Sequence, residues 1–297
     1  MRMPVIVGCT AMAAGLLFLG LVVPQYRPIA IAAPQASTEA KPVDRPLLQA
    51  RPVAFTTPQA AGGFQAWALL DTRTSVISGS DDMSATSDTV SMVKAWLAAD
   101  YLRIAAQRRQ RPTPARLTEL SIMIRDSDND AAQDIYQLNG STESIQRLIQ
   151  LCGLTDSAAV PDLWSDTRMS PRDAVRMGAC VADGRAAGPQ WTTWLVNEMR
   201  HVRGDGRFGV VNALPAAAAA KTAIKNGWLL RDTDGLWHVN CLAAGDGWVL
   251  AVMMRYAAAL GFEHGGEVCE SVTTQLMDPV VTAGQAATTS PRPVTSY

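Results

Sequence analysis

The pattern of hydrophobic and polar positions predicts strands near both ends of the central region of the chain. Residues 64–70 and 75–80 flank the polar turn 71–74, which favours a pair of antiparallel strands. Further along, turns rich in Asp and Gly separate three apolar segments that favour an antiparallel meander: 223–230, 236–242 and 248–256. One antiparallel sheet assembled from distant parts of the chain is therefore expected.

The region between these strands has apolar residues at helical spacing. Val93, Trp96, Leu97 and Tyr101, for example, recur with the period of a helix that ends before Pro112. Helices are predicted over 90–107, 117–124, 129–138, 142–151, from Ser170 onward, over 189–202 and over 267–276. This order predicts an α+β domain whose antiparallel sheet, formed by the N- and C-terminal segments, packs against a helical lobe. A functional site is expected in the cleft between the sheet and the lobe.

The N-terminal region has the character of an export signal. Residues 4–23 form an uncharged, apolar run behind Arg2, so residues 1–33 are predicted to be a signal peptide or an anchor in contact with the membrane. The sequence leaves cleavage open, because two prolines separate the apolar run from the small residues 30–32. Cys9 follows a lipobox-like triplet, but the apolar run follows this cysteine instead of preceding it, which disfavours lipid attachment. The remainder is expected outside the cytoplasm, secreted or anchored.

Composition shifts set the expected limits of the folded part. Residues 34–52 are rich in Pro and Ala and are interpreted as a linker, and residues 279–297 as a flexible tail. Residues 53–278 then form one domain of ordinary size, expected to be a monomer.

Charge and composition exclude several classes of function. The chain has 297 residues, a net charge of −1 and 18% charged residues, so no basic face for nucleic acid is implied. Its three histidines are scattered and lack the spacing of zinc ligands. We therefore expect no metal and no cofactor, and the chemistry has to come from Ser, Lys, Asp and Asn.

The cysteines predict two disulfides. Besides Cys9 there are four: Cys152, Cys180, Cys241 and Cys269. An even number in an exported chain favours disulfides, and four cysteines allow three pairings. Cys152 with Cys180 and Cys241 with Cys269 is favoured, because each pair lies within one region of the predicted fold.

The first candidate motif is Ser91-Met92-Val93-Lys94. Three residues are nearly one helical turn, so Ser91 and Lys94 point the same way. A lysine can accept the proton of a nucleophilic serine if burial lowers its pKa. The alternative is a capping serine followed by a surface lysine.

The second motif, Ser127-Asp128-Asn129, lies where a loop turns into a helix. Its polar side chains could reach a cleft, and the alternative is a run of helix caps. A calcium loop is excluded, because its sixth and twelfth positions would be Ala131 and Gln137 instead of glycine and glutamate.

The third motif, Lys225-Asn226-Gly227-Trp228, lies inside an apolar strand, where an unpaired lysine is unfavourable. Glycine there allows another backbone to approach closely. The alternative is a lysine on an exposed edge strand. Lys221 starts a rival motif that lacks the glycine.

In this order the three motifs resemble the S-x-x-K, S-D-N and K-T-G set of the serine β-lactamases and penicillin-binding DD-peptidases, class A in particular. Residues 66–71 and 204–215 are also similar to segments of that family, so the resemblance spans about 64–276. It implies a β-lactamase/transpeptidase-like fold and a β-lactam or peptidoglycan peptide as the substrate.

The resemblance also implies a role for each matching residue. Ser91 would be the acylated nucleophile, Lys94 its base, Ser127 the shuttle that protonates the leaving nitrogen, and Lys225 the partner of Ser127 and of a substrate carboxylate.

Four residues would bind the substrate: Asn129 its amide carbonyl, Asn226 and Gly227 as part of the third motif, and Trp228 through its backbone N–H. The N–H groups of Ser91 and Trp228 would form an oxyanion hole.

The chain departs from the class A pattern in one functionally important loop. Class A enzymes deacylate with a loop glutamate, whereas here no glutamate occurs between Glu143 and Glu198. Beyond Asp156, the loop 156–170 offers only Asp162 and Asp166, whose side chains are shorter. Three hypotheses follow: an acyl-enzyme hydrolase that deacylates slowly, a true β-lactamase in which Asp166 or Lys94 manages the water, and a catalytically idle domain that binds peptidoglycan or a partner at the cell surface.

Overall fold

An antiparallel sheet built from the two ends of the folded region is the base of the structure. The computed structural model describes residues 46–57, 60–277 and 279. The strand order is β2-β1-β8-β7-β5, and β6 also pairs with β7. The strands are β1 (Phe64–Asp71), β2 (Val76–Gly79), β5 (Ala223–Ile224), β6 (Gly227–Arg231), β7 (Leu236–Gly245) and β8 (Trp248–Ala257). The predicted sheet of N- and C-terminal segments is thus confirmed.

Long strand pairs make the centre of this sheet. β1 lies along β8 over its whole length, from the pair Phe64–Arg255 to the pair Asp71–Trp248. β7 and β8 form a hairpin whose turn contains Gly247 at a φ of 79°. Only a residue without Cβ adopts that conformation readily, which explains the Asp-Gly signal in the sequence.

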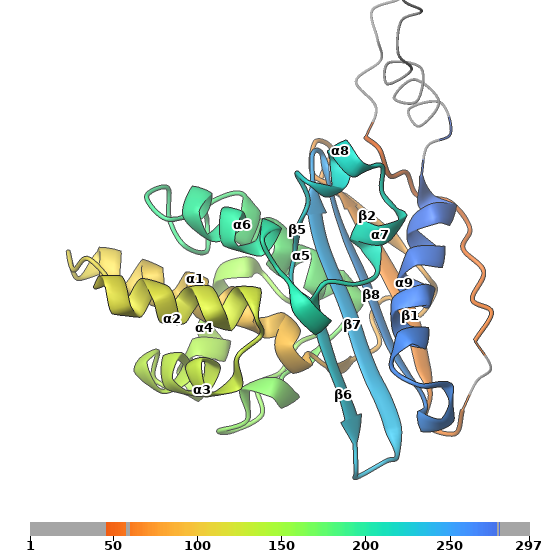
Figure 1. Ribbon diagram of the computed structural model, residues 1–297, viewed down its shortest axis with the longest axis horizontal. Helices are drawn as coiled ribbons and strands as arrows, with labels where there is room; N and C mark the ends of the chain where they lie inside the picture. The colour runs from red at the N-terminus through yellow and green to blue at the C-terminus, as the bar shows by residue number, and fades with distance from the viewer. Residues whose placement is uncertain (1–45, 58–59, 278, 280–297) are drawn as a thin grey trace, which may run out of the picture. The chain divides into compact units, whose positions relative to one another are not determined.

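The helices cover both faces of the sheet (Figure 1). On one face lies α9 (Glu263–Leu276), where a Cβ on Gly265 would come within 2.7 Å of Val239 in β7. On the other face α5 (Pro171–Ala182) packs, and a Cβ on Gly178 would lie 2.7 Å from Val249 in β8. Glycine therefore sets how closely each helix approaches the sheet.

The helical lobe lies beyond α5 and is centred on α1 (Lys94–Gln107), which is buried on most sides. Its other helices are α2 (Pro114–Arg125), α3 (Asn129–Leu138), α4 (Thr142–Cys152) and α6 (Thr192–Arg200). Two shorter helices precede β5, α7 (Val210–Ala213) and α8 (Ala216–Ala219). Four 3-10 helices are η1 (Val90–Val93), η2 (Trp164–Asp166), η3 (Gly204–Gly206) and η4 (Ala258–Leu260), and a two-stranded ladder pairs β3 (Ser87–Asp88) with β4 (Arg168–Met169).

Local sequence signals predicted the first residue of several helices correctly, but for other helices the predicted and observed first residues differ. Ser170 caps α5 by accepting the N–H of Asp173, with Pro171 in the first turn, as predicted. The predicted helix over 90–107 instead begins as η1 and becomes α-helical only at Lys94. Helices α2 and α9 begin before the predicted residues 117 and 267, because their first turns carry few apolar side chains.

Two further expectations need correction. The strand predicted over 223–230 is interrupted at 225–226. Its two pieces, β5 and β6, both pair with β7. Part of the predicted linker 34–52 belongs to the folded domain, since Leu47 and Leu48 are buried and Leu48 forms a bridge with Met277. The predicted signal segment 1–33 lies outside the described residues, as does the predicted tail apart from residue 279.

Both predicted disulfides are confirmed. Cys152–Cys180 joins α4 to α5 with a Cα–Cα distance of 5.6 Å, and Cys241–Cys269 joins β7 to α9 at 6.5 Å. Each cross-link therefore fastens one helix to its neighbouring layer. Over the described range, no helix combines the length and apolar character needed to cross a membrane.

Candidate functional site

The three motifs meet where the helical lobe faces the sheet. Lys94 Nζ donates to Asn129 Oδ1 at 2.7 Å, to the Ser127 carbonyl and, at 3.4 Å, to Ser127 Oγ. Lys225 Nζ approaches from between β5 and β6 and donates to Ser127 Oγ at 2.9 Å. Segments more than thirty residues apart are thus joined around the Ser127 hydroxyl.

Gly227 brings the start of β6 against the turn that carries Ser91. A Cβ on Gly227 would lie 2.7 Å from the carbonyl oxygen of Thr89 and 2.8 Å from the backbone nitrogens of Ser91 and Met92. Any larger residue would push the two backbones apart. The close approach that the glycine predicted is therefore present, and it is made to the first motif.

Two residues of the site have a left-handed backbone. Val90, directly before Ser91, has a φ of 47°, and Ser127 has a φ of 60°. For a β-branched residue such as Val90 this conformation is a genuine outlier. Strain of this kind concentrates at functional sites, where the surrounding packing maintains it.

Burial changes the ionisation of both lysines. Lys94 is fully buried, and burial lowers its pKa to about 7, although the charge of Asp128 acts in the opposite direction. Lys225 is also fully buried, and burial together with the charge of Lys94 lowers its pKa well below the ordinary value. A neutral amine is therefore available near neutral pH.

Ser91 lies in η1 and is 7% exposed. Among the described residues its Oγ has no hydrogen-bond partner, and the Lys94 amine is directed to Ser127 and Asn129. The hydroxyl is thus free to approach a ligand, and it makes no hydrogen bond to Lys94.

Asn226 serves the fold and not the cleft. Its Nδ2 donates to the carbonyls of Gly206 and Phe208 at 3.1 and 3.0 Å, and its Oδ1 accepts from the backbone N–H of Leu242 at 3.3 Å. The side chain is 1% exposed, so the expectation that it binds substrate is not supported by its orientation. It bridges the interruption between β5 and β6, which explains an amide at this position.

Trp228 packs its ring into an aromatic cluster. Its centroid lies 5.8 Å from that of Phe208 and 6.0 Å from that of Phe262. The ring of Trp228 is therefore packed in this cluster. The role that the resemblance implies, donation to an oxyanion, falls to the backbone N–H of Trp228. Lys221, the rival third-motif lysine, is exposed.

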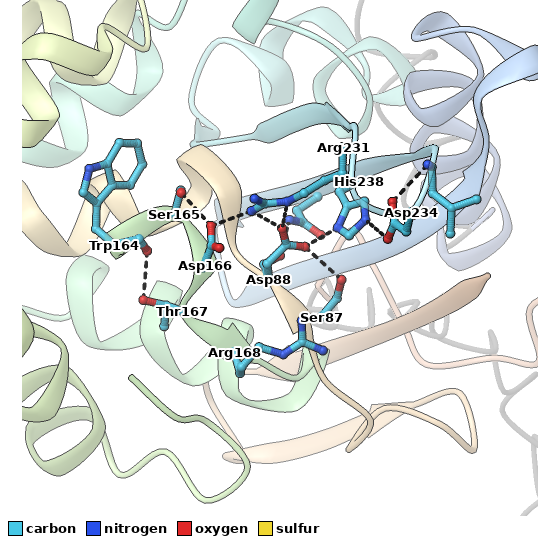
Figure 2. Close-up of polar contacts among 12 residues, drawn as sticks. Ser87, Asp88, Trp164, Ser165, Asp166, Thr167, Arg168, Arg231, Asp234 and His238 are labelled. Carbon is cyan, nitrogen blue, oxygen red and sulfur yellow. Dashed lines mark hydrogen bonds and ion pairs between the residues drawn. The ribbon is translucent and has the colours of Figure 1, made fainter. Parts of the chain in front are cut away.

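The loop between α4 and α5 contributes Trp164, which the sequence did not single out, beside the two aspartates that it did. The Trp164 ring centroid lies 5.1 Å from Lys94 Nζ. Arg231 of β6 holds Asp166 at 2.6 Å and also binds Asp88, as Figure 2 shows. Asp162, the other candidate carboxylate of the loop, is exposed.

A buried polar cluster extends from this loop to the sheet. Asp88 is 3% exposed and accepts from His238 Nδ1, while His238 Nε2 lies 2.9 Å from Asp234 (Figure 2). Burial by itself raises the pKa of Asp88, but the hydrogen bonds and charges of His238 and Arg231 outweigh it and lower the pKa. No motif marks these residues in the sequence, because they come from three separate parts of the chain: Asp88, Asp166 and the hairpin of β6 and β7.

Within the part of the chain that the structure describes, no group of three His, Cys, Asp or Glu side chains could hold a metal ion. The polar groups of the site are instead two amines, two hydroxyls and an amide, a set suited to proton transfer.

No family model matches the sequence. Over 160 residues it is 26% identical to a protein of Mycobacterium tuberculosis that bears the name "Putative lipoprotein LppW", and the match covers 51% of this chain and 50% of that protein. The Mycobacterium bovis protein of the same name matches equally. The chain thus spans about half the length of the curated relatives it matches.

Solved structures are similar over most of the chain. A class A β-lactamase of Bacteroides cellulosilyticus has a TM-score of 0.61 at 13% identity, covering 74% of this chain and 92% of that one. An ancestral class A β-lactamase has a TM-score of 0.56 at 19% identity, covering 75% and 95%. The β-lactamase of Desulfarculus baarsii has a TM-score of 0.54 at 18% identity, covering 72% and 91%. The chain therefore has the fold of the class A β-lactamases, as the motifs predicted.

Proposed function

We propose that this protein is an exported serine hydrolase that forms an acyl-enzyme at Ser91 and releases it slowly. The observation that carries the proposal is the convergence of Lys94, Ser127 and Lys225 beside the Ser91 turn, which Gly227 holds against β6. These residues supply a nucleophile, a neutral amine and a proton relay at one place in the fold.

In the proposed acylation, Ser91 Oγ attacks the carbonyl carbon of a β-lactam or a peptidoglycan peptide. Neutral Lys94 receives the hydroxyl proton, the new ester C–O bond forms, and the C–N bond breaks. Ser127 passes a proton to the leaving nitrogen and is replenished from the neighbouring lysines. The backbone N–H groups of Ser91 and Trp228 stabilise the oxyanion, Asn129 binds the substrate amide, and Lys225 attracts its carboxylate.

Deacylation lacks an obvious base. Asp166 is engaged by Arg231 and by the Ser165 hydroxyl, and Asp162 is exposed. The Asp166 carboxylate therefore already has two hydrogen-bond donors before any water binds. The acyl-ester is therefore expected to persist, and this makes the slow hydrolase the first choice over a fast β-lactamase.

One observation favours an alternative function. Ser91 Oγ has no partner among the described residues, and Lys94 is bonded to Ser127 and Asn129. A catalytically idle domain that binds peptidoglycan or a partner at the cell surface would need no Ser–Lys contact. Hydrogen bonds of unliganded catalytic sites are often long, however, so we place this alternative second.

The relatives support a location in the cell envelope, since they are named as lipoproteins. We propose that residues 1–33 direct the chain out of the cytoplasm and contact the membrane. Peptidoglycan peptides would then be accessible to the domain.

The test is to incubate the full-length protein with a reporter penicillin and to follow its intact mass over time. We expect a long-lived adduct that Ser91→Ala abolishes and that Ser84→Ala, a change at an exposed serine, leaves in place. An adduct that appears and disappears with product would identify a β-lactamase. Unchanged labelling of Ser91→Ala would refute the assigned nucleophile, and no labelling of the wild type would favour the idle domain.

A further inference from the structure

The indole of Trp164 covers the proposed base. Its ring lies over Lys94 Nζ at 5.1 Å, and its N–H donates to Gln133 Oε1 on α3 at 3.1 Å. Lys94 has no exposed surface. An aromatic ring within about 6 Å of an amine takes up space on that side that water would otherwise fill.

The backbone that carries Trp164 is fastened on two sides. Thr167 Oγ1 donates to the Trp164 carbonyl at 2.9 Å, and Arg231 binds Asp166 at 2.6 Å. The same Arg231 binds Asp88, which lies three residues before Ser91, so one guanidinium connects the loop to the nucleophile's segment (Figure 2). The ring is therefore held in place by bonds that do not involve Lys94.

We propose that Trp164 is a positioning residue that seals Lys94 from bulk water and thereby prolongs the life of the Ser91 ester. The inference rests on the proposed function. Hydrolysis requires a water whose oxygen bonds to the acyl carbon while the ester C–O bond breaks and Ser91 regains a proton. Lys94 is the base proposed for Ser91 and can serve that water in the same way, and the Trp164 ring excludes water from its side of the amine.

The experiment compares wild type with Trp164→Ala, which removes the cover, and Trp164→Phe, which keeps a ring and loses the bond to Gln133. Trp194→Ala is the matched control, because this half-buried indole lies on α6 and packs against Trp191. After excess penicillin is removed, the half-life of the Ser91 adduct is followed by intact mass. We expect Trp164→Ala to shorten it by about tenfold or more, and the other two variants to remain near wild type.

A second readout is independent of penicillin. Brief acetylation with acetic anhydride, followed by peptide mapping, reports the accessibility of Lys94, and exposed Lys221 serves as the internal standard. Trp164→Ala should increase acetylation of Lys94 relative to Lys221, while Trp164→Phe should not. Thermal unfolding of each variant confirms that the assay temperature lies below its transition.

The outcomes separate the two proposals. A wild-type adduct with the same half-life in Trp164→Ala overturns the role of Trp164 and leaves the acyl-enzyme intact. If no wild-type adduct forms, the proposed function fails. Equal acetylation of Lys94 in wild type and Trp164→Ala overturns the proposed role of Trp164, whether or not an adduct forms. A faster loss of adduct in Trp164→Ala together with greater Lys94 acetylation supports it.

Discussion

Lys94 combines full burial with a pKa of about 7, and both follow from its place at the first residue of α1 between the lobe and the sheet. A lysine in water would be almost wholly protonated at neutral pH and could not accept the serine proton. At this position about half of the molecules hold a neutral amine at pH 7. The chemistry proposed for Ser91 depends on that shift.

The rate of acylation should therefore depend on pH. Only neutral Lys94 can accept the proton of Ser91, so the rate of adduct formation should rise as the pH increases through about 7 and then level off. Intact mass at early times, measured between about pH 5.5 and 8.5, gives the profile. A rate that does not change over this range would contradict Lys94 as the base.

The same burial predicts a conflict between activity and stability. The unfolded-state pKa of Lys94 is 10.5 and the folded value is about 7, so at low pH the folded state carries the full penalty of a buried charge. Lys94→Met should abolish adduct formation and stabilise the fold at pH 7 by about 1 kcal/mol, which raises the Tm by a few degrees. The wild type gains stability as the pH rises from 7 towards 10.5, so this advantage should shrink there. Thermal unfolding at several pH values checks the sign, and a lower Tm for Lys94→Met at pH 7 would contradict it.

At the scale of elements, the site depends on how closely β6 approaches η1 and on the bonds that hold helices to neighbouring layers. Gly227 sets the distance between β6 and η1, because a Cβ at this position would meet three backbone atoms that cannot rotate away. The two disulfides are the bonds between layers, since one joins α4 to α5 and the other joins β7 to α9.

Gly227→Ala should abolish acylation. The new Cβ would lie within 2.8 Å of the Ser91 and Met92 backbone nitrogens, so the turn has to move and the oxyanion donors move with it. We also expect a loss of about 1–3 kcal/mol of stability. Gly266→Ala is the control, because its Cβ would meet Phe208 at an ordinary 3.6 Å. Retention of the adduct in Gly227→Ala would contradict the assigned geometry.

Removal of a disulfide should destabilise the fold. Replacing both Cys241 and Cys269 by Ser frees α9 from β7, and the unfolded chain regains the entropy of a loop of 28 residues. A loss of about 2–4 kcal/mol is expected from loops of this size. Denaturant unfolding with and without reductant measures it. Equal stability of the wild type under both conditions would show that the cross-links do not stabilise the fold.

At the scale of the whole molecule, the Asp88 cluster connects segments that are far apart in the sequence. Asp88 in β3 contacts Arg231 in β6 and His238 in β7, and through Arg231 it reaches Asp166 in η2. The two ring nitrogens of His238 face carboxylate oxygens, Nδ1 that of Asp88 and Nε2 that of Asp234. The cluster thus positions the loop with Trp164 relative to the sheet.

Asp88→Asn should lower stability at pH 7 by about 1–3 kcal/mol, because the half-buried Arg231 loses one of its two carboxylates and the buried His238 loses a charged partner. Asp88 has a folded-state pKa below its ordinary 3.8, so its contribution is present above that pH and is lost as the pH falls through the lower folded value. The difference from wild type should therefore shrink below about pH 4. Denaturant unfolding at neutral and acid pH tests this, with exposed Asp81→Asn as the control. A difference that stays constant with pH would contradict the assigned ionisation.

Local patterns were sufficient for much of this architecture. Alternating segments predicted the two ends of the sheet, and Ser170-Pro171 predicted the start of α5. The disulfide pairing that the structure has was favoured because each cysteine pair lies within one region of the predicted fold. The motifs that contain Ser91, Ser127 and Lys225 were recognisable because each is short and contiguous. The roles of their residues remain predictions.

Tertiary structure decided the rest. The break at 225–226, the inward turn of Asn226, the cover of Lys94 by Trp164 and the Asp88 cluster all depend on contacts between segments far apart in the chain. Sequence periodicity reports which face of an element is buried, but not which distant side chain lies opposite it. Burial also depends on all neighbouring segments together, so the lowered pKa of Lys94 could be stated only as a requirement of the chemistry until the fold was known.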